Sequence, residues 1–128
     1  MKTVGEVMAR DLVTLSEEVA LTEAAAAMNA RHVGSALVVR DERLIGILTE
    51  RDVLHAVGAG RIGDRVADWM TKHPESVDAD ESTQQAAVVM IHGGFRHLPV
   101  LDGGKPVGIV SIRDLMRVVV DDESPRGV

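Results

Sequence analysis

The sequence contains no cysteine and almost no aromatic residues, and both absences restrict what it can be. Without cysteine there can be no disulfide framework and no thiolate metal site. Tyrosine is absent, and phenylalanine and tryptophan occur once each, so a core must be built from aliphatic side chains. The absence of disulfides and of a leader segment favours a cytoplasmic protein.

Long apolar runs and an excess of positive charge are also missing. No run approaches the roughly 20 residues that span a bilayer, and the N-terminal MKTVGEVMARD has no hydrophobic segment of the signal-peptide type. The 14 Lys and Arg residues face 20 Asp and Glu residues, which gives a formal net charge of −6. Nucleic-acid binders usually carry a basic excess. We therefore expect neither a membrane nor a nucleic acid as a partner.

The chain also lacks the short motifs that mark common catalytic sites. It contains no nucleophile elbow of the form G-x-S-x-G, no Walker phosphate loop and no zincin motif. None of its five histidines is paired at the His-x-x-x-His spacing of a helical metal site. We expect a protein that is not an enzyme and has no metal ligands of its own. Magnesium could still accompany bound phosphates without a dedicated protein cage.

What the sequence does contain is an internal repeat. The phrases GILTERD (46–52) and GIVSIRD (108–114) are nearly the same and lie 62 residues apart. With that constant shift, residues 4–58 align with residues 66–120 without a gap. Two copies are too few for a solenoid, so a closed arrangement of two halves is favoured.

Each copy predicts a short helical segment followed by the order β-α-β-β-α, a mixed α/β (α+β) fold. In both copies apolar residues recur at the spacing of one helix face: Leu21, Ala24, Ala25 and Met28, and then Ala86, Ala87, Met90 and Ile91. Two apolar runs joined by a polar turn predict the strands: SALVV with LIGILT, and HLPVL with PVGIVS. A final helix carries a second apolar set: Val53, Leu54 and Val57, and then Leu115, Met116 and Val119.

These patterns divide the chain into three parts. We expect the first repeat over residues 1–60 and the second over residues 61–120, with a glycine-containing linker around residues 58–63. Residues 121–128 are polar and contain a proline and a glycine, which predicts a flexible tail.

The end of each repeated phrase places a hydroxyl residue three positions before an aspartate, Thr49 with Asp52 and Ser111 with Asp114. One interpretation is a helix N-cap, in which the hydroxyl accepts a backbone N–H and the acid lies in the first turn. The other is a ligand site. A helix N-terminus suits a phosphate, and a carboxylate can accept two hydrogen bonds from a ribose diol. The glycine that opens each phrase, which a cap does not require, would let a flat ring approach the backbone.

Over about residues 4–120 the chain resembles a tandem pair of CBS domains, often called a Bateman module. The resemblance rests on VGEVMARDLVTL and VADWMTKHPESV, on VGSALVV and FRHLPVL, and on the two G-h-x-[TS]-x-x-D phrases, where h is hydrophobic. It implies two repeats packed about a pseudo-two-fold axis. It also implies two clefts between the repeats that bind adenosine-containing ligands: AMP, ADP, ATP or, less often, S-adenosylmethionine.

The resemblance further implies which residues line each cleft. In cleft A the adenine slot, the apolar wall behind it and the phosphate and ribose contacts would come from Val13, Val33, Gly34, Ser35, Ala36, Ile109, Ser111 and Asp114. In cleft B the polar pair, the apolar wall and the residues facing the base would be Thr49, Asp52, Ile47, Glu75, Phe95, Arg96, His97 and Leu98. Arg96 and His97 are the best candidates to approach a phosphate. The first copy has Gly34 and Ser35 at their positions, so the positive charge is unequal.

Together these features predict a non-catalytic regulatory module that binds adenine nucleotides and acts as an energy or ligand sensor for a partner protein. The resemblance also implies a homodimer. Two other functions stay open from the sequence. One is a ligand-free structural dimerisation module whose hydroxyl–acid pairs only cap helices, and the other is a regulator that responds to S-adenosylmethionine or a metal.

Overall fold

The computed structural model describes residues 2–123, with side chains to residue 118, and divides them into two compact units. Unit 1 comprises residues 2–10, 75–103 and 107–123, and unit 2 comprises residues 11–74 and 104–106. Each unit has its own sheet and its own core, and the fold is mixed α/β.

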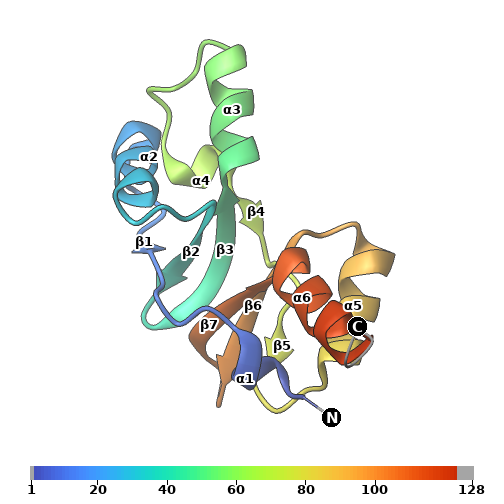
Figure 1. Cartoon of the computed structure of the whole chain (residues 1–128). Helices are drawn as coiled ribbons and strands as arrows, with labels where there is room; N and C mark the ends of the chain where they lie inside the picture. Colours follow the sequence, from blue (N-terminus) through green and yellow to red (C-terminus); the bar gives the residue numbers. More distant parts are fainter. Residues whose placement is uncertain (1, 124–128) are drawn as a thin grey trace. The chain divides into compact units, whose positions relative to one another are not determined.

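Unit 2 is built on a four-stranded sheet in the order β1-β2-β3-β4 (Figure 1). Its strands are β1 (Thr14–Leu15), β2 (Ser35–Arg40), β3 (Arg43–Thr49) and β4 (Thr71–Lys72). β1 runs parallel to β2, and the other two pairings are antiparallel. Its helices are α2 (Leu21–Ala30), α3 (Glu50–Gly58) and α4 (Val66–Trp69).

Unit 1 repeats this plan with a three-stranded sheet in the order β5-β6-β7. Its strands are β5 (Val77–Asp78), β6 (His97–Asp102) and β7 (Lys105–Ser111), and its helices are α1 (Val4–Val7), α5 (Thr83–Gly93) and α6 (Ile112–Glu123). A single bridge between Ala9 and Ile109 stands where unit 2 pairs Thr71 with Ile47. The predicted order of elements is therefore confirmed in both repeats.

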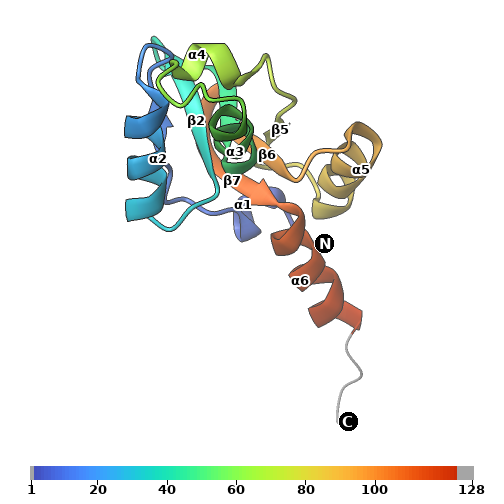
Figure 2. The same ribbon diagram turned by 90° about the horizontal axis from the view of Figure 1, so that it is seen from above.

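The opening helix of each sequence repeat belongs to the unit that holds the rest of the other repeat. In unit 1, the N–H of Val4 donates to Glu81 O at 2.8 Å, and the Val4 side chain is fully buried. In unit 2, the N–H of Val66 donates to Val19 O at 2.8 Å, and Val66 is also fully buried. Both views draw α4 beside α3 and α1 beside α6 (Figure 1, Figure 2). The segment that follows the linker is anchored to α2, because the N–H of Leu21 donates to Asp64 O at 2.9 Å.

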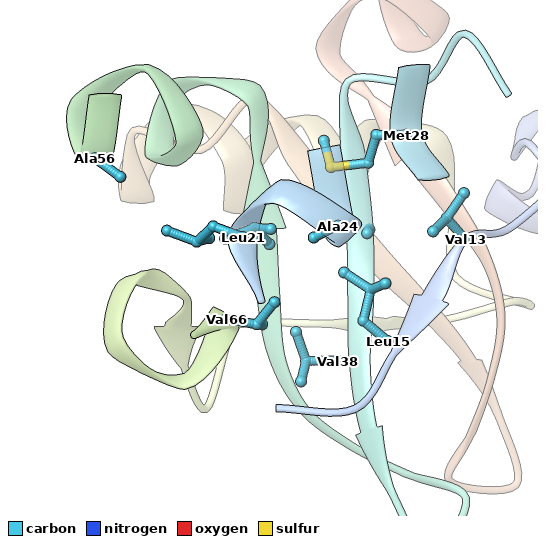
Figure 3. Packing of buried hydrophobic residues seen from close by; sticks show 10 residues of the cluster. Val13, Leu15, Leu21, Ala24, Met28, Val38, Ala56 and Val66 are labelled. Atoms are coloured by element: carbon cyan, nitrogen blue, oxygen red, sulfur yellow. The ribbon is translucent and has the colours of Figure 1, made fainter. Parts of the chain in front are cut away.

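Each core is aliphatic, as the shortage of aromatic residues requires. Figure 3 shows the cluster of unit 2, in which Leu21 of α2, Val38 of β2 and Val66 of α4 are all buried. In unit 1 the corresponding cluster includes Met90 of α5 and Val100 of β6. Each such side chain stabilises its unit by about 1.5–3 kcal/mol when fully buried. These cores hold the strand ends and helix starts that carry the repeated phrases.

The prediction of an inward-facing apolar side chain is wrong for four residues, because they face solvent in this structure. The exposed fractions are 70% for Ile91, 67% for Leu54, 55% for Val57 and 51% for Met116. The α3 face that packs inward is narrower than predicted, with Ala56 buried and Val53 half-buried. The predicted side-chain role of Val119 lies outside the described residues.

Two expectations concern the ends and the environment of the chain. Helix α6 continues to Glu123, three residues into the expected tail, and the rest of that tail lies outside the described residues. Within residues 2–123, every helix is too short or too polar to cross a membrane.

Candidate functional site

In unit 2 the hydroxyl–acid pair forms a reciprocal cap at the start of α3. Thr49 has extended backbone angles, and its Oγ1 accepts from the Asp52 N–H at 3.3 Å. In return, Asp52 Oδ2 accepts from the Thr49 N–H at 2.8 Å and from the Thr49 hydroxyl at 3.1 Å. The capping interpretation is confirmed here. The second carboxylate oxygen, Oδ1, takes no part in the cap.

Unit 1 builds the same cap at the start of α6 with one difference. Ser111 Oγ accepts from the Asp114 N–H at 3.1 Å, and Asp114 Oδ2 accepts from the Ser111 N–H at 3.0 Å. The Ser111 hydroxyl, however, donates no hydrogen bond to the Asp114 carboxylate in the described structure, whereas the Thr49 hydroxyl donates to that of Asp52. The outer oxygen of Asp114 lies 4.0 Å from Arg117 Nη1, a loose surface pair.

The glycine that opens each phrase serves packing inside its own unit, which corrects the suggestion that it makes room for a flat ring. A Cβ on Gly46 would lie 2.6 Å from Met70 Sδ and 3.0 Å from Thr71 O. A Cβ on Gly108 would collide with Met8 Sδ in the same way. The backbone that approaches each glycine belongs to the segment directly after the opening helix, α4 for Gly46 and α1 for Gly108. The glycines therefore carry no argument for a ligand.

Several of the predicted site residues lie together in unit 2, at the end of the sheet where β2 begins and β3 leads into α3. Ser35 is the register partner of Thr49 across β2 and β3, and the N–H of Glu50 donates to Gly34 O at 2.9 Å. The start of β2 therefore lies against the start of α3. We call this group the Thr49 edge; its residues are Gly34, Ser35, Thr49, Glu50, Arg51 and Asp52.

Unit 1 has the matching edge. The N–H of Ile112 donates to Arg96 O at 2.9 Å, which sets the start of β6 against the start of α6. We call this group the Ser111 edge; its residues are Arg96, His97, Ser111, Ile112, Arg113 and Asp114. Each edge thus combines residues that the resemblance assigned to different clefts. Clefts A and B each draw on both units and stay predictions.

The remaining predicted residues have varied surroundings. Val13, Ala36 and Leu98 are buried within the cores of their own units, so their side chains already have packing partners. Phe95 is half-buried with its ring against the backbone of Gly93. Val33 is half-buried beside the core of unit 2, and Ile47 is buried on β3. Ile109 lies on β7, and Glu75 is exposed before β5.

The charges of the two edges differ, and sequence reasoning overlooked one of the residues responsible. Glu50 is absent from the predicted set, although the mismatch with Ile112 at the same repeat position signals it. The sequence leaves two interpretations open for Arg51 and Arg113, which follow the hydroxyl of each repeated phrase: a phosphate contact or a surface ion pair. Within residues 2–118, neither these two nor Arg96 has a hydrogen bond or ion pair from its side chain.

Three carboxylates and the guanidinium of Arg31 have clear pKa shifts, and all of these groups lie outside the two edges. The indole N–H of Trp69, with help from Arg61, holds the pKa of Asp64 below its usual value. The hydrogen bond from Arg31 likewise lowers the pKa of Asp11, whereas Asp78 raises the pKa of Asp80. In the part of the chain that the structure describes, no three His, Asp or Glu side chains gather in a way that could hold a metal ion.

Comparison with known proteins gives a consistent picture. The family model described as "CBS domain" matches residues 4–59 and again residues 66–121. An uncharacterised 17.7 kDa protein of Acidianus ambivalens is 37% identical over 120 residues, which covers 92% of this chain and 73% of that protein. Other relatives are longer: the chain spans 62% of a Methanopyrus kandleri protein and 43% of a Methanocaldococcus jannaschii protein.

Solved structures agree in fold over nearly the whole chain. A putative signal-transduction protein with CBS domains from Burkholderia ambifaria is 32% identical, with a TM-score of 0.86 and coverage of 99% of this chain and 100% of that one. CBSX2, solved in complex with AMP, is 25% identical, with a TM-score of 0.79 and coverage of 95% and 98%. CBSX2 comes from Arabidopsis thaliana. The two repeats, their shared element order and these matches show that this chain belongs to the CBS domain family and contains two CBS domains.

Proposed function

We propose that this chain is a regulatory module without catalytic activity that binds adenosine-containing nucleotides, AMP, ADP or ATP, through the Thr49 and Ser111 edges. The observation that carries the proposal is the hydroxyl–acid pair, which recurs with the same cap geometry at the start of α3 and of α6. The likeness to CBSX2, which was solved with AMP, supports the choice of ligand.

The chemistry of each edge supports the same ligand class. The cap uses only Oδ2 of Asp52 and of Asp114, so the other carboxylate oxygen can accept from a ribose hydroxyl. The first N–H groups of the helix and their positive potential suit a phosphate. A magnesium ion would arrive with the phosphates and would not need a protein cage.

The contacts to the base follow the predicted clefts. The polar pair of one unit would hold the sugar, and residues of the other repeat would face the adenine. At the phosphate and ribose end the proposal follows the edges, with Arg96 and His97 beside Ser111 and with Gly34 and Ser35 beside Thr49. The proposed adenine contacts are the remaining cleft residues: Val13, Val33 and Ala36 for the Ser111 edge, and Glu75, Phe95 and Leu98 for the Thr49 edge, with Ile109 and Ile47 as the apolar walls.

The strongest competing account is a structural module in which both pairs only cap helices. Thermal shift measurements with AMP, ADP, ATP and S-adenosylmethionine separate the two. Ligand at 100 times its dissociation constant adds about 2.7 kcal/mol, a rise of about 8–12 °C for a chain of this size. The ligand-free account predicts no rise with any of them.

Single variants identify the edges. Asp52→Ala and Asp114→Ala should each remove one binding event and cost about 0.5–2 kcal/mol of stability through the lost cap. Asp68→Ala is the matched control, because Asp68 also accepts the N-cap N–H of its helix, from Arg65 at 3.0 Å, and lies outside both edges. The control should keep the ligand response of the parent; if Asp52→Ala and Asp114→Ala also keep it, the proposed site is wrong.

A signal requires that the ligand bind one conformation of the protein more tightly than another, because only differential affinity shifts a population. A separate effector protein would then read that shift. We further propose a homodimer that buries exposed apolar residues of the helices, Leu54 and Val57 on α3 and Ile91 on α5. Light scattering at two protein concentrations tests this directly, and a constant monomer mass would overturn it.

A further inference from the structure

We propose that Glu50 makes the two edges differ in the charge of the ligand they take. The Ser111 edge would take adenosine ligands that carry phosphate, and the Thr49 edge would prefer an adenosine ligand without phosphate, either neutral or cationic. This inference rests on the proposed function, since it concerns the same two edges.

The position of Glu50 comes from its contact with Gly34. A Cβ on Gly34 would lie 3.2 Å from Glu50 Cδ and Oε1 and 3.3 Å from Oε2. The carboxylate therefore lies against Gly34, the residue just before β2, on the same edge as Thr49 and Asp52. Within residues 2–118, no cation pairs with it.

The second repeat reverses this charge at the corresponding positions. Ile112 stands where Glu50 stands in the first repeat, and Arg96 stands where Gly34 stands. Because Arg51 and Arg113 are also counterparts, they do not create the difference. Glu50, Arg51 and Asp52 give the Thr49 edge one net negative charge. Arg96, Arg113 and Asp114 give the Ser111 edge one net positive charge, with His97 counted as neutral. An anionic ligand is therefore repelled at the first edge and attracted at the second.

The hydroxyl groups differ in the same direction. The Thr49 hydroxyl donates its proton to Asp52, so it has none to offer a phosphate oxygen. The Ser111 hydroxyl makes no such bond to Asp114 and can donate to a ligand. Phosphate oxygens accept hydrogen bonds and cannot donate when ionised. The free donor thus lies on the edge with the positive charge.

A structural role for Glu50 makes a different prediction. An acid in the first turn of a helix stabilises that helix through its dipole. In that case removing the charge would lower stability slightly and would affect all adenosine ligands equally. The ratio of AMP affinity to adenosine affinity therefore distinguishes selectivity from helix stabilisation.

The test is a calorimetric titration with AMP and with adenosine, carried out in the Asp114→Ala background so that the Thr49 edge is measured. Glu50→Gln removes the charge and keeps the shape. We expect it to tighten AMP binding about three- to tenfold relative to adenosine, with the gain shrinking at high salt. The matched control is Glu23→Gln, the same exchange at an exposed position in the first turn of α2.

The other edge provides the reciprocal measurement. In the Asp52→Ala background, Arg113→Gln should weaken AMP about three- to tenfold and leave adenosine unchanged. An unchanged AMP-to-adenosine ratio in Glu50→Gln, or the same change in Glu23→Gln, overturns the role of Glu50 while the proposed function stands. If neither AMP nor adenosine binds the parent chain, the proposed function fails, and the inference fails with it.

Discussion

The glycine that opens each repeated phrase shows how a residue with an apparent binding role can be fixed by packing alone. Gly46 faces Met70 and the backbone of Thr71, and Gly108 faces Met8 and the backbone of Ala9. In both units the opening helix leads directly into the segment that crosses this glycine. The repetition of the glycine thus follows from the repetition of the fold.

We predict that Gly46→Ala destabilises the protein by about 1–3 kcal/mol, because the added methyl must displace both a methionine sulfur and a backbone carbonyl. Urea unfolding followed by Trp69 fluorescence measures this in unit 2, which holds the only tryptophan. Gly63→Ala is the control, since nothing lies within 4 Å of its added Cβ. Equal stability of the two variants would contradict the packing role.

A second prediction at this scale concerns Asp64. The Trp69 N–H and Arg61 favour its ionised form, so its pKa in the folded protein is below the unfolded value of about 3.9. A lowered pKa contributes stability that is present above the unfolded value and is lost as the pH falls through the folded value. Asp64→Asn should therefore reduce stability near pH 7, and the difference from the parent should narrow below about pH 4. A difference that is constant with pH would contradict this.

At the scale of elements, the two β-hairpins solve the same turn with different residues. The turn between β2 and β3 places Asp41 and Glu42 at φ values of 51° and 65°. The turn between β6 and β7 places Gly103 and Gly104 at 60° and 84°. Two central residues with positive φ are typical of the tight hairpin turn that favours Asn-Gly. The first hairpin therefore holds a strained glutamate that the second avoids.

We predict that the double change Asp41→Asn and Glu42→Gly stabilises the protein by about 1 kcal/mol, because glycine adopts positive φ without the steric cost that other residues incur. Thermal unfolding measures the gain. The surface pair between Glu42 and Lys105, at 3.6 Å, is lost in this variant, but an exposed pair of this kind contributes little. A loss of stability would show that the turn is not strained.

The elements were the most predictable part of this protein. The apolar spacing of α2 and the runs of β2 and β3 follow from periodicity, because burial on one face requires it. The outer residues of the helices were not predictable in the same way. Leu54 and Ile91 fit an apolar face in sequence, yet they are exposed, because each helix contacts its own unit over a narrow strip. Periodicity gives the direction of a face but not its width.

At the scale of the whole molecule, the exchange of opening helices means that neither sequence repeat forms a unit by itself. The side chain of Val4 completes the core that otherwise comes from the second repeat, and Val66 completes the core of the first. No pattern of hydrophobicity could reveal this, because a short amphipathic helix fits either partner. Aligning the repeats shows that the helices are equivalent without showing where each one packs.

We predict that Val4→Ala loosens unit 1 and that Val66→Ala loosens unit 2. Each change removes two buried methyl groups and should cost about 2 kcal/mol, equivalent to about 30-fold faster local exchange. Hydrogen exchange with mass spectrometry should show faster exchange in α5 and β6 for Val4→Ala, and in α2 and β2 for Val66→Ala. The reverse pattern would contradict the packing of each opening helix in the unit of the other repeat.

The candidate site was only partly predictable for a related reason. The pairs Thr49–Asp52 and Ser111–Asp114 were found from spacing alone, and their caps have the geometry that the spacing requires. Glu50 was overlooked because its importance lies in a contact with Gly34, which is distant in sequence. The charge of a site depends on which strand start meets which helix start, and that is a property of the assembled sheet.

The most direct test of the central claim is an isothermal titration of the parent chain and of the Asp52→Ala/Asp114→Ala double variant with AMP. We predict measurable binding by the parent and none by the double variant, with Asp68→Ala binding like the parent. Binding of AMP by the double variant with the affinity of the parent would contradict the account.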